Sequence, residues 1–280
     1  MKKIIVIIFT LLIILQGTGC SLNSMGGFIE RKVKDDVYLE GENVGGMREP
    51  EVRSRILNYA RSIDTNAKNA CMDDVTWQIK ESEAWGRKVN MDKTLETIYT
   101  AKKGSRVSLC IEEIKPQVMS AALANNIIEI GKFSTPIIDD RESRINNIHV
   151  AAEYLDYHKV APGEEFSFNR VLGKRSANKG YEWAPIIIKT EEGYKRGYGI
   201  GGGVCQLSTT LYNAVEMCGL NVTERHIHSK NIGYVPRGQD ATVSYGSVDF
   251  KFKNNREHTI MIRAFLTDSD VTVKILENRN

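Results

Sequence analysis

The chain has 280 residues, of which 41% are hydrophobic and 26% are charged. These fractions are typical of a folded globular protein and argue against a disordered chain. The formal net charge is +3, and removing the two lysines at positions 2 and 3 leaves +1. Such a balance gives no global basic field, so we expect no nucleic-acid partner.

The first twenty residues have the pattern of an export signal. Two lysines precede a twelve-residue apolar run, Ile4–Leu15, which is too short to span a bilayer and typical of a signal-peptide core. Small residues then precede Cys20, and this segment resembles a bacterial lipoprotein processing site, although Gly17 occupies the position where leucine is usual. We predict a signal segment over 1–20, with lipidation at Cys20 or an uncleaved anchor as the alternatives, and a linker over 21–34. The expected location is the outer face of the cytoplasmic membrane or the cell wall.

Residues 35–118 alternate between strand and helix patterns. The predicted strands lie near 37–39, 75–79 and 107–111, and the predicted helices begin at Pro50, at Asp92 as the N-cap, and at Pro116. This is a small α+β domain without a catalytic group, so binding or spacing is its expected role. Its two cysteines, Cys71 and Cys110, can pair with each other or be buried as free thiols.

Residues 119–280 predict a second, β-rich α+β domain. A helix is expected from 144 to 158, a turn at Pro162-Gly163 leads into a strand, and further strands are expected near 248–252, 259–265 and 271–275. The 271–275 strand is predicted to close the domain as an edge or final strand. The three histidines at 149, 158 and 258 are interpreted as surface or boundary residues.

Within this domain a run of three glycines, 201–203, precedes a predicted helix that begins near Cys205. The N–H groups and positive dipole end at the start of a helix favour a thiolate, which is the nucleophilic form of cysteine. His226 and His228 follow about twenty residues later and offer a base. The alternatives are a buried, inert Cys205 and a phosphate-binding loop, but the Lys-Ser/Thr of a P-loop is missing. Cys218, on the apolar face of the same helix, is predicted to be core.

Several motifs between Arg144 and Ile262 together resemble the VanW family of exported bacterial proteins. They are Pro162-Gly163-Glu164-x-Phe166-Ser167-Phe168-Asn169, Gly180-Tyr181, Gly201-Gly202-Gly203-Val204-Cys205-Gln206-x-Ser208-Thr209-Thr210-x-Tyr212-Asn213, Glu224-Arg225-x-x-His228-Ser229, Tyr234-Val235-Pro236-x-Gly238-x-Asp240-Ala241-Thr242-Val243 and Asp249. The preceding segment, roughly 37–116, is similar to the domain assigned to peptidoglycan binding that often precedes a VanW domain.

This resemblance implies a cell-wall role, with peptidoglycan stem peptides as partners and no cofactor. Some members of the family are linked to L,D-transpeptidase activity with the family cysteine as nucleophile, a role that falls here on Cys205. The family histidine corresponds to His228, whereas His226 occupies an open position of the motif and is the weaker base. The His-Gly-Cys arrangement of other L,D-transpeptidases is absent from this chain.

The remaining candidate residues complete an acyl-transfer mechanism. Asp240 is expected to orient the imidazole, with an Asx turn at 238–240 as the alternative. Backbone groups at the start of the helix are expected to hold an oxyanion; they belong to Gly203, Val204, Cys205 and Gln206. Arg225 is expected to bind a stem carboxylate or to pair with Glu224. Three motif residues are added as substrate-binding candidates: Asn169, Ser208 and Tyr234.

Three other functions use the same residues. A wall-binding or scaffold protein would contain an inert Cys205, and a cysteine peptidase or amidase would pass the acyl group to water. A zinc site built from Cys205, His226 and His228 has suitable ligand types, but no fourth ligand stands at metal-site spacing. We therefore predict no metal.

Overall fold

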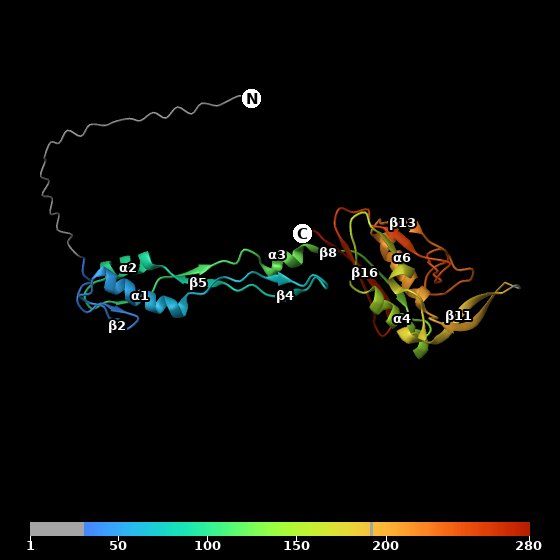
Figure 1. The fold of residues 1–280 in the computed structure, drawn as a ribbon, viewed down its shortest axis with the longest axis horizontal. Helices are drawn as coiled ribbons and strands as arrows, with labels where there is room; N and C mark the ends of the chain where they lie inside the picture. The colour runs from blue at the N-terminus through green and yellow to red at the C-terminus, as the bar shows by residue number, and fades with distance from the viewer. Residues whose placement is uncertain (1–30, 191–192) are drawn as a thin grey trace, which may run out of the picture. The chain divides into compact units, whose positions relative to one another are not determined.

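The computed structural model describes residues 31–190 and 193–280 (Figure 1). The predicted signal segment and the lipidation candidate Cys20 lie outside these residues. No helix of the described part is both long and apolar enough to cross a membrane. Six α-helices occur in this part together with several sheets, which confirms the α+β class.

The chain divides into two compact units, and each is described by itself. Residues 31–64 and 89–112 form the described part of the first unit, and residues 65–88 and 113–280 belong to the second. The chain passes between the units after Asp64, within β5 (Gly86–Val89) and within β7 (Ile111–Ile114). The predicted domains, 35–118 and 119–280, stay predictions.

The first unit packs two helices with a small sheet. Its elements are β1 (Tyr38–Leu39), β2 (Glu42–Asn43), α1 (Glu49–Ile63), α2 (Met91–Thr100) and β6 (Arg106–Val107), with strand order β2-β1-β6. The buried face of α1 consists of Val52, Ile56 and Ala60, which are four residues apart and therefore lie on one side of the helix. Asn90, and not the predicted Asp92, caps α2, because its side chain accepts the Lys93 N–H at 2.9 Å.

The predicted strand at 75–79 is wrong over its first half. The Asp73 carboxylate accepts the backbone N–H groups of Val75 and Thr76, and this side-chain bonding closes a turn instead of leaving the segment extended. Trp77 follows in the left-handed region, with φ 55°, and is buried. The strand begins only at β4 (Ile79–Glu81), which pairs with β3 (Cys71–Met72).

A four-stranded antiparallel sheet forms the base of the second unit. Its order is β8-β16-β15-β9, made of β8 (Ile127–Pro136), β16 (Asp270–Asn278), β15 (Ile260–Leu266) and β9 (His158–Val160). The predicted final strand, β16, is therefore internal and not an edge, because β8, which the sequence pattern did not reveal, pairs along its other side. The helices α4 (Glu142–Leu155) and α6 (Val204–Met217) pack on this sheet and on each other.

The rest of the second unit carries the loops of the site. A second sheet has the order β10-β14-β13, made of β10 (Glu165–Ser167), β14 (Lys251–Lys253) and β13 (Asn221–Glu224). The short helices α3 (Ser120–Asn125) and α5 (Phe168–Leu172) and a 3-10 turn, Ala177–Lys179, lie between the strands in sequence. An unpredicted hairpin, β11 (Trp183–Thr190) and β12 (Gly193–Ile200), leads directly into the glycine run before α6.

The four described cysteines, Cys71, Cys110, Cys205 and Cys218, are free thiols. Cys71 is exposed and Cys110 is half-buried, so neither is the fully buried core residue that was one of the two expectations. Cys218 packs against the hydrophobic core, as predicted, and burial raises the pKa of its thiol to about 12. Among the described thiols, Cys218 is therefore a poor nucleophile.

Candidate active site

The glycine run brings two backbone segments into contact just before α6. A Cβ on Gly202 would lie 2.5 Å from the Pro185 carbonyl oxygen, which no side chain can tolerate. Gly203 is the N-cap of α6 and has a φ of 106°, a conformation that glycine adopts without steric cost. Cys205 is therefore fixed in the first turn of the helix by the local geometry.

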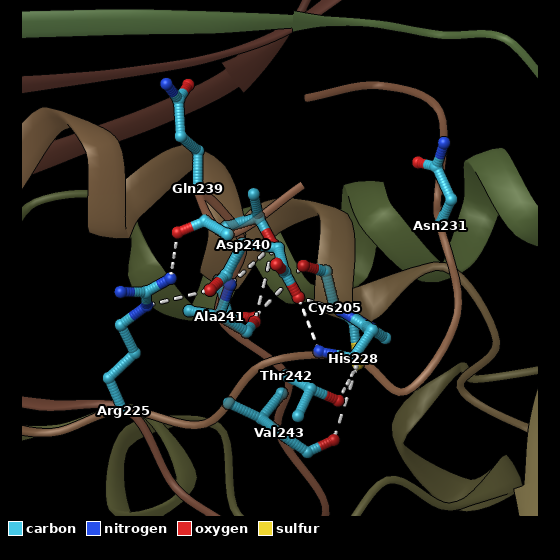
Figure 2. Close-up of polar contacts among 12 residues, drawn as sticks. Cys205, Arg225, His228, Asn231, Gln239, Asp240, Ala241, Thr242 and Val243 are labelled. Carbon is cyan, nitrogen blue, oxygen red and sulfur yellow. Dashed lines mark hydrogen bonds and ion pairs between the residues drawn. The ribbon is translucent and has the colours of Figure 1, made fainter. Parts of the chain in front are cut away.

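The Cys205 thiol faces an extended segment that follows Asp240. Its Sγ lies 3.4 Å from the Val243 carbonyl oxygen and 3.7 Å from Thr242 Oγ1 (Figure 2). The Thr242 N–H donates to the His226 carbonyl at 2.8 Å, which aligns this segment antiparallel to the one that carries His228. The alignment places residue 228 opposite residue 240.

His228 lies close to both Asp240 and Cys205, and these three residues are called the Cys205–His228–Asp240 series. His228 Nδ1 lies 2.6 Å from Asp240 Oδ2, and the same oxygen accepts the His228 backbone N–H at 2.6 Å (Figure 2). The carboxylate thus fixes both the ring and the backbone of His228. Because Nδ1 is engaged with Asp240, Nε2 is the ring nitrogen left to interact with the Cys205 thiol, whose pKa His228 lowers. The Asp240 carboxylate thus contacts the imidazole, and the turn before it is closed by the Gln239 N–H, which donates to the Pro236 carbonyl at 3.1 Å, with Gly238 at φ 87°.

The electrostatics of this pair favour a thiolate and an imidazolium. Burial disfavours the Cys205 thiolate, but the hydrogen bond and positive charge of His228 outweigh it and lower the pKa of the thiol. Burial likewise disfavours a charged His228, but its bonds and opposite charges at Cys205 and Asp240 raise the pKa of the imidazole. Both shifts act in the direction that activates a cysteine nucleophile.

The comparisons with known proteins assign the family of this region. The family model described as VanW like protein matches residues 143–276, which include all three members of the Cys205–His228–Asp240 series. Residues 143–276 are a VanW-like domain. No solved structure matches the chain.

Two curated relatives are similar to part of this chain. The uncharacterized protein YoaR of Bacillus subtilis is 41% identical over 183 residues, which cover 64% of this chain and 59% of YoaR. The vancomycin B-type resistance protein VanW of Enterococcus faecalis is 28% identical over 144 residues, which cover 50% of this chain and 51% of VanW. The matched segment thus spans little more than half the length of these relatives.

The second histidine candidate lies elsewhere in the VanW-like domain. His226 is exposed, and its Nε2 lies 3.1 Å from Glu224 Oε1 instead of facing Cys205. His228 is therefore the histidine that the structure brings to the thiol. Within the described residues, no group of three His, Cys, Asp or Glu side chains could hold a metal ion.

Arg225 binds the protein's own backbone instead of an exposed carboxylate. Its Nε donates to the Asp240 carbonyl at 2.9 Å, a terminal nitrogen donates to the Gly238 carbonyl, and the guanidinium lies 4.2 Å from the centre of the Tyr212 ring. The expected ion pair with Glu224 is not formed, because Glu224 pairs with Lys251. Arg225 thus holds the turn that presents Asp240 (Figure 2).

The polar face of α6 holds the same segment from the other side. Ser208 Oγ donates to the Ala241 carbonyl at 2.6 Å, and Thr209 Oγ1 accepts the Ala241 N–H at 3.1 Å. Asn213 Nδ2 donates to the Gln239 carbonyl at 2.8 Å. Ser208 is fully buried, so the structure gives this substrate-binding candidate a positioning contact instead.

Only part of the expected oxyanion site has free N–H groups. The Gln206 N–H donates to the Gly203 carbonyl at 2.9 Å, and the Val204 N–H donates to the Gly201 carbonyl at 3.3 Å. The N–H groups of Cys205 and Gly203 have no acceptor among the described residues, so they are the donors of the expected oxyanion site that remain available at the start of α6. The Gln206 side chain is also engaged, with its oxygen accepting from Arg144 Nη2 at 2.7 Å.

The last two candidates differ in their relation to Cys205. Tyr234 is close enough to the thiol for charge at Cys205 to add to the effect of burial in raising the pKa of its phenol. Asn169 is buried and binds the 244–248 loop, donating to the carbonyls of Ser244 and Val248 at 3.2 and 2.8 Å. Its side chain is therefore a structural bridge.

Two arginines near Cys205 were not identified from the sequence. Arg144, on α4, and Arg175, after α5, both lie near enough to Cys205 for the charge at the thiol to raise their pKa values against the lowering effect of burial. Arginines are usually exposed, and their spacing in the chain gives no sign of burial, so no pattern pointed to them.

Proposed function

We propose that this protein acts outside the cytoplasmic membrane on peptidoglycan stem peptides and transfers an acyl group through Cys205, in the manner of an L,D-transpeptidase. The vancomycin-resistance name of the relative VanW supports the cell-wall setting. The observation that carries the chemistry is the Cys205–His228–Asp240 series, because nucleophile, base and orienting carboxylate are the parts that acyl transfer needs.

The proposed first half-reaction forms a thioester. The Cys205 thiolate attacks an amide carbonyl carbon, a C–S bond forms, and the carbonyl oxygen gains the negative charge opposite the Cys205 N–H. When the tetrahedral intermediate collapses, the C–N bond breaks. The His228 imidazolium donates its proton to the leaving amine, while Asp240 holds the ring in place.

The second half-reaction passes the acyl group to an amine. A second stem offers its amino group, His228 accepts a proton from it, and the new C–N bond forms as the C–S bond breaks. The Cys205 thiolate is restored with a protonated His228. If water replaces the amine, the same groups give a peptidase or amidase.

The location is part of the proposal. The basic and apolar start of the chain supports export, and Cys20 is proposed as its lipidated residue. The first unit is proposed to bind the cell wall and keep the VanW-like domain at its substrate. Fatty-acid labelling of wild-type cells and of cells with Cys20→Ala tests this, because label on the wild-type protein that the variant lacks supports lipidation and an absence of label from both contradicts it.

The decisive experiment uses the chain without residues 1–20 and defined tetrapeptide-stem muropeptides. Intact-protein mass and product mass are followed together for the wild type and for Cys205→Ala. A thioester adduct and a cross-linked dimer, both absent in the variant, are expected. Shortened monomers alone would show that the acyl group passes to water and not to an amine. Equal stem binding by the wild type and Cys205→Ala, with no adduct in either, would show a non-catalytic wall-binding protein.

A further inference from the structure

Two arginines pack on either end of the glycine run before Cys205. A Cβ on Gly201 would lie 3.0 Å from the Arg175 Cβ and Cγ atoms, and one on Gly203 would lie 2.9 Å from Arg144 Cγ. Both side chains therefore run along the turn that fixes the nucleophile. Their guanidinium groups differ in how they are paired.

Arg144 has protein partners for its hydrogen bonds and its charge. Its Nη2 donates to Gln206 Oε1 at 2.7 Å, and its Nη1 donates to the Asp139 carbonyl at 3.4 Å. The Asp139 carboxylate lies 3.8 Å from Nε and provides the opposite charge. A buried arginine with these contacts is explained by the fold.

The burial of Arg175 is not explained by such hydrogen bonds and an ion pair. Its Nη1 donates to Asn169 Oδ1 at 2.7 Å and to the Gly173 carbonyl at 3.0 Å, but its Nη2 is buried and has no partner among the described residues. The acidic group in its surroundings, Asp249, already accepts from Ser167 Oγ and from two backbone N–H groups. Arg175 is thus a partly buried cation whose hydrogen bonds in the described residues are all to neutral oxygens, while its guanidinium lies 5.6 Å from the centre of the Phe168 ring.

A second unpartnered donor lies beside the same glycine. The Tyr181 hydroxyl is buried and has no partner in the described part, and the Tyr181 ring lies 3.9 Å from the position of a Cβ on Gly201. Burial raises the pKa of Tyr181 to about 12, so the phenol stays protonated and can donate. Buried polar groups without partners are uncommon in native proteins, and two that adjoin one turn call for a shared explanation.

We propose that Arg175 and Tyr181 form a carboxylate-binding subsite beside Cys205, which recognises an acidic group of the peptide whose carbonyl the thiol attacks. A guanidinium N–H and a phenol O–H provide one donor for each oxygen of a carboxylate. Among the described residues the Arg175 guanidinium hydrogen-bonds to no carboxylate, although the charge of Asp249 acts on it, and it gains a bonded carboxylate when such a peptide binds. This subsite takes the role that the sequence had suggested for Arg225, and it rests on the proposed acyl transfer for the identity of its ligand.

The test compares two alkylating reagents that differ in charge. Iodoacetate and iodoacetamide both form an S–CH2 bond with the thiolate as the C–I bond breaks and iodide leaves, but only iodoacetate carries a carboxylate. Their rates are measured at Cys205 by peptide mass analysis. The same ratio at Cys71, which is an exposed thiol of the same chain, is the internal reference.

In the wild type we expect the iodoacetate-to-iodoacetamide ratio at Cys205 to exceed that at Cys71 by about tenfold, as a charge-assisted hydrogen bond allows. Arg175→Gln should remove most of this preference, and Tyr181→Phe should reduce it several-fold. Arg170→Gln, a nearby exposed arginine, is the matched control and should leave the ratio unchanged. Both subsite variants keep His228 and Asp240, so a loss cannot come from the imidazolium.

An unchanged ratio in folded Arg175→Gln and in Tyr181→Phe would overturn the subsite. If Arg175→Gln does not fold, Tyr181→Phe decides, because it deletes a hydroxyl that bonds to no described group. Alkylation needs no turnover, so the two proposals can fail separately. A preference for iodoacetate without muropeptide products would contradict the proposed function and support the subsite. Muropeptide products without that preference would support the proposed function and contradict the subsite.

Discussion

Helices α1 and α6 have similar lengths but bury different kinds of side chain. The buried residues of α1 are all apolar, namely Val52, Ile56 and Ala60. Tyr59 and Ile63 pack partly buried against the same core, and most of the remaining residues face solvent. In α6 eleven residues are buried, and five of them are polar: Gln206, Ser208, Thr209, Thr210 and Asn213. Helix α1 thus contributes buried side chains to a hydrophobic core alone, and α6 also contributes side chains to a hydrogen-bond network.

The difference shows how the VanW-like domain places its nucleophile. Each buried polar group of a helix needs a partner, and those of α6 find theirs in Thr135 of β8 and in the 239–241 segment. The network therefore bonds the segment that contains Asp240 to the helix that contains Cys205. We infer that substitutions in α1 change stability alone, whereas those around α6 change the reactivity of the thiol.

The largest expected effect is on the stability of the first unit. Ile56 is fully buried, and Ile56→Ala should lower the free energy of unfolding of this unit by about 3 kcal/mol, because the lost side chain leaves a cavity. Chemical denaturation followed by circular dichroism measures this. The exposed neighbour Leu57, changed to Ala, is the control. A changed alkylation rate at Cys205 in Ile56→Ala would contradict the inference that substitutions in α1 change stability alone.

The next effect is on the thiol itself. Without the cation at position 228, burial alone acts on Cys205, so His228→Gln should raise the pKa of the thiol above that of an ordinary cysteine. The pH profile of iodoacetamide labelling should then shift to higher pH, and the rate at neutral pH should fall by about a hundredfold, or about 2.7 kcal/mol. His149→Gln, on the exposed side of α4, should leave the profile in place. Coincident profiles would show that His228 does not activate the thiol.

Asp240→Asn tests the third residue of the Cys205–His228–Asp240 series and should have a smaller effect on labelling at Cys205. The amide keeps the size of the side chain but removes the charge that helps to raise the pKa of His228. Fewer molecules then contain the imidazolium at neutral pH, and labelling at Cys205 should slow by about tenfold, which is about 1.4 kcal/mol. The titration of His228, followed by NMR, should move to lower pH. A His228 titration like that of the wild type would count against the orienting role.

The smallest effect is expected for the network on α6. Ser208→Ala removes the hydrogen bond to the Ala241 carbonyl and should lower the free energy of unfolding by about 1 kcal/mol. Labelling at Cys205 should change by less than tenfold, since the thiol–imidazole pair remains. Ser247→Ala, at an exposed hydroxyl, is the control for thermal denaturation. A full loss of labelling in Ser208→Ala would mean that the network does more than hold the segment.

The sequence reveals those parts of the site that are encoded locally. The glycine run and the apolar spacing predict α6 with Cys205 in its first turn, and of the motif residues His228 lies at the thiol while Asp240 bonds to the His228 ring. The burial of Arg175 is set by Gly201 and Asn169, which are distant from each other in the chain, so no local pattern shows it. The same reason hides β8 and the strand order around β16.

The position of β16 has a consequence for how the protein is made. Residues 270–278 are synthesised after every other strand of the four-stranded sheet, yet they lie between β8 and β15. Until these residues leave the ribosome, β8 lacks the partner along which it pairs, and the contacts that close the sheet join residues more than 130 positions apart. Such non-local pairing slows folding. The second unit therefore completes its sheet only after this segment is available, and until then the unpaired edge of β8 is a site for aggregation.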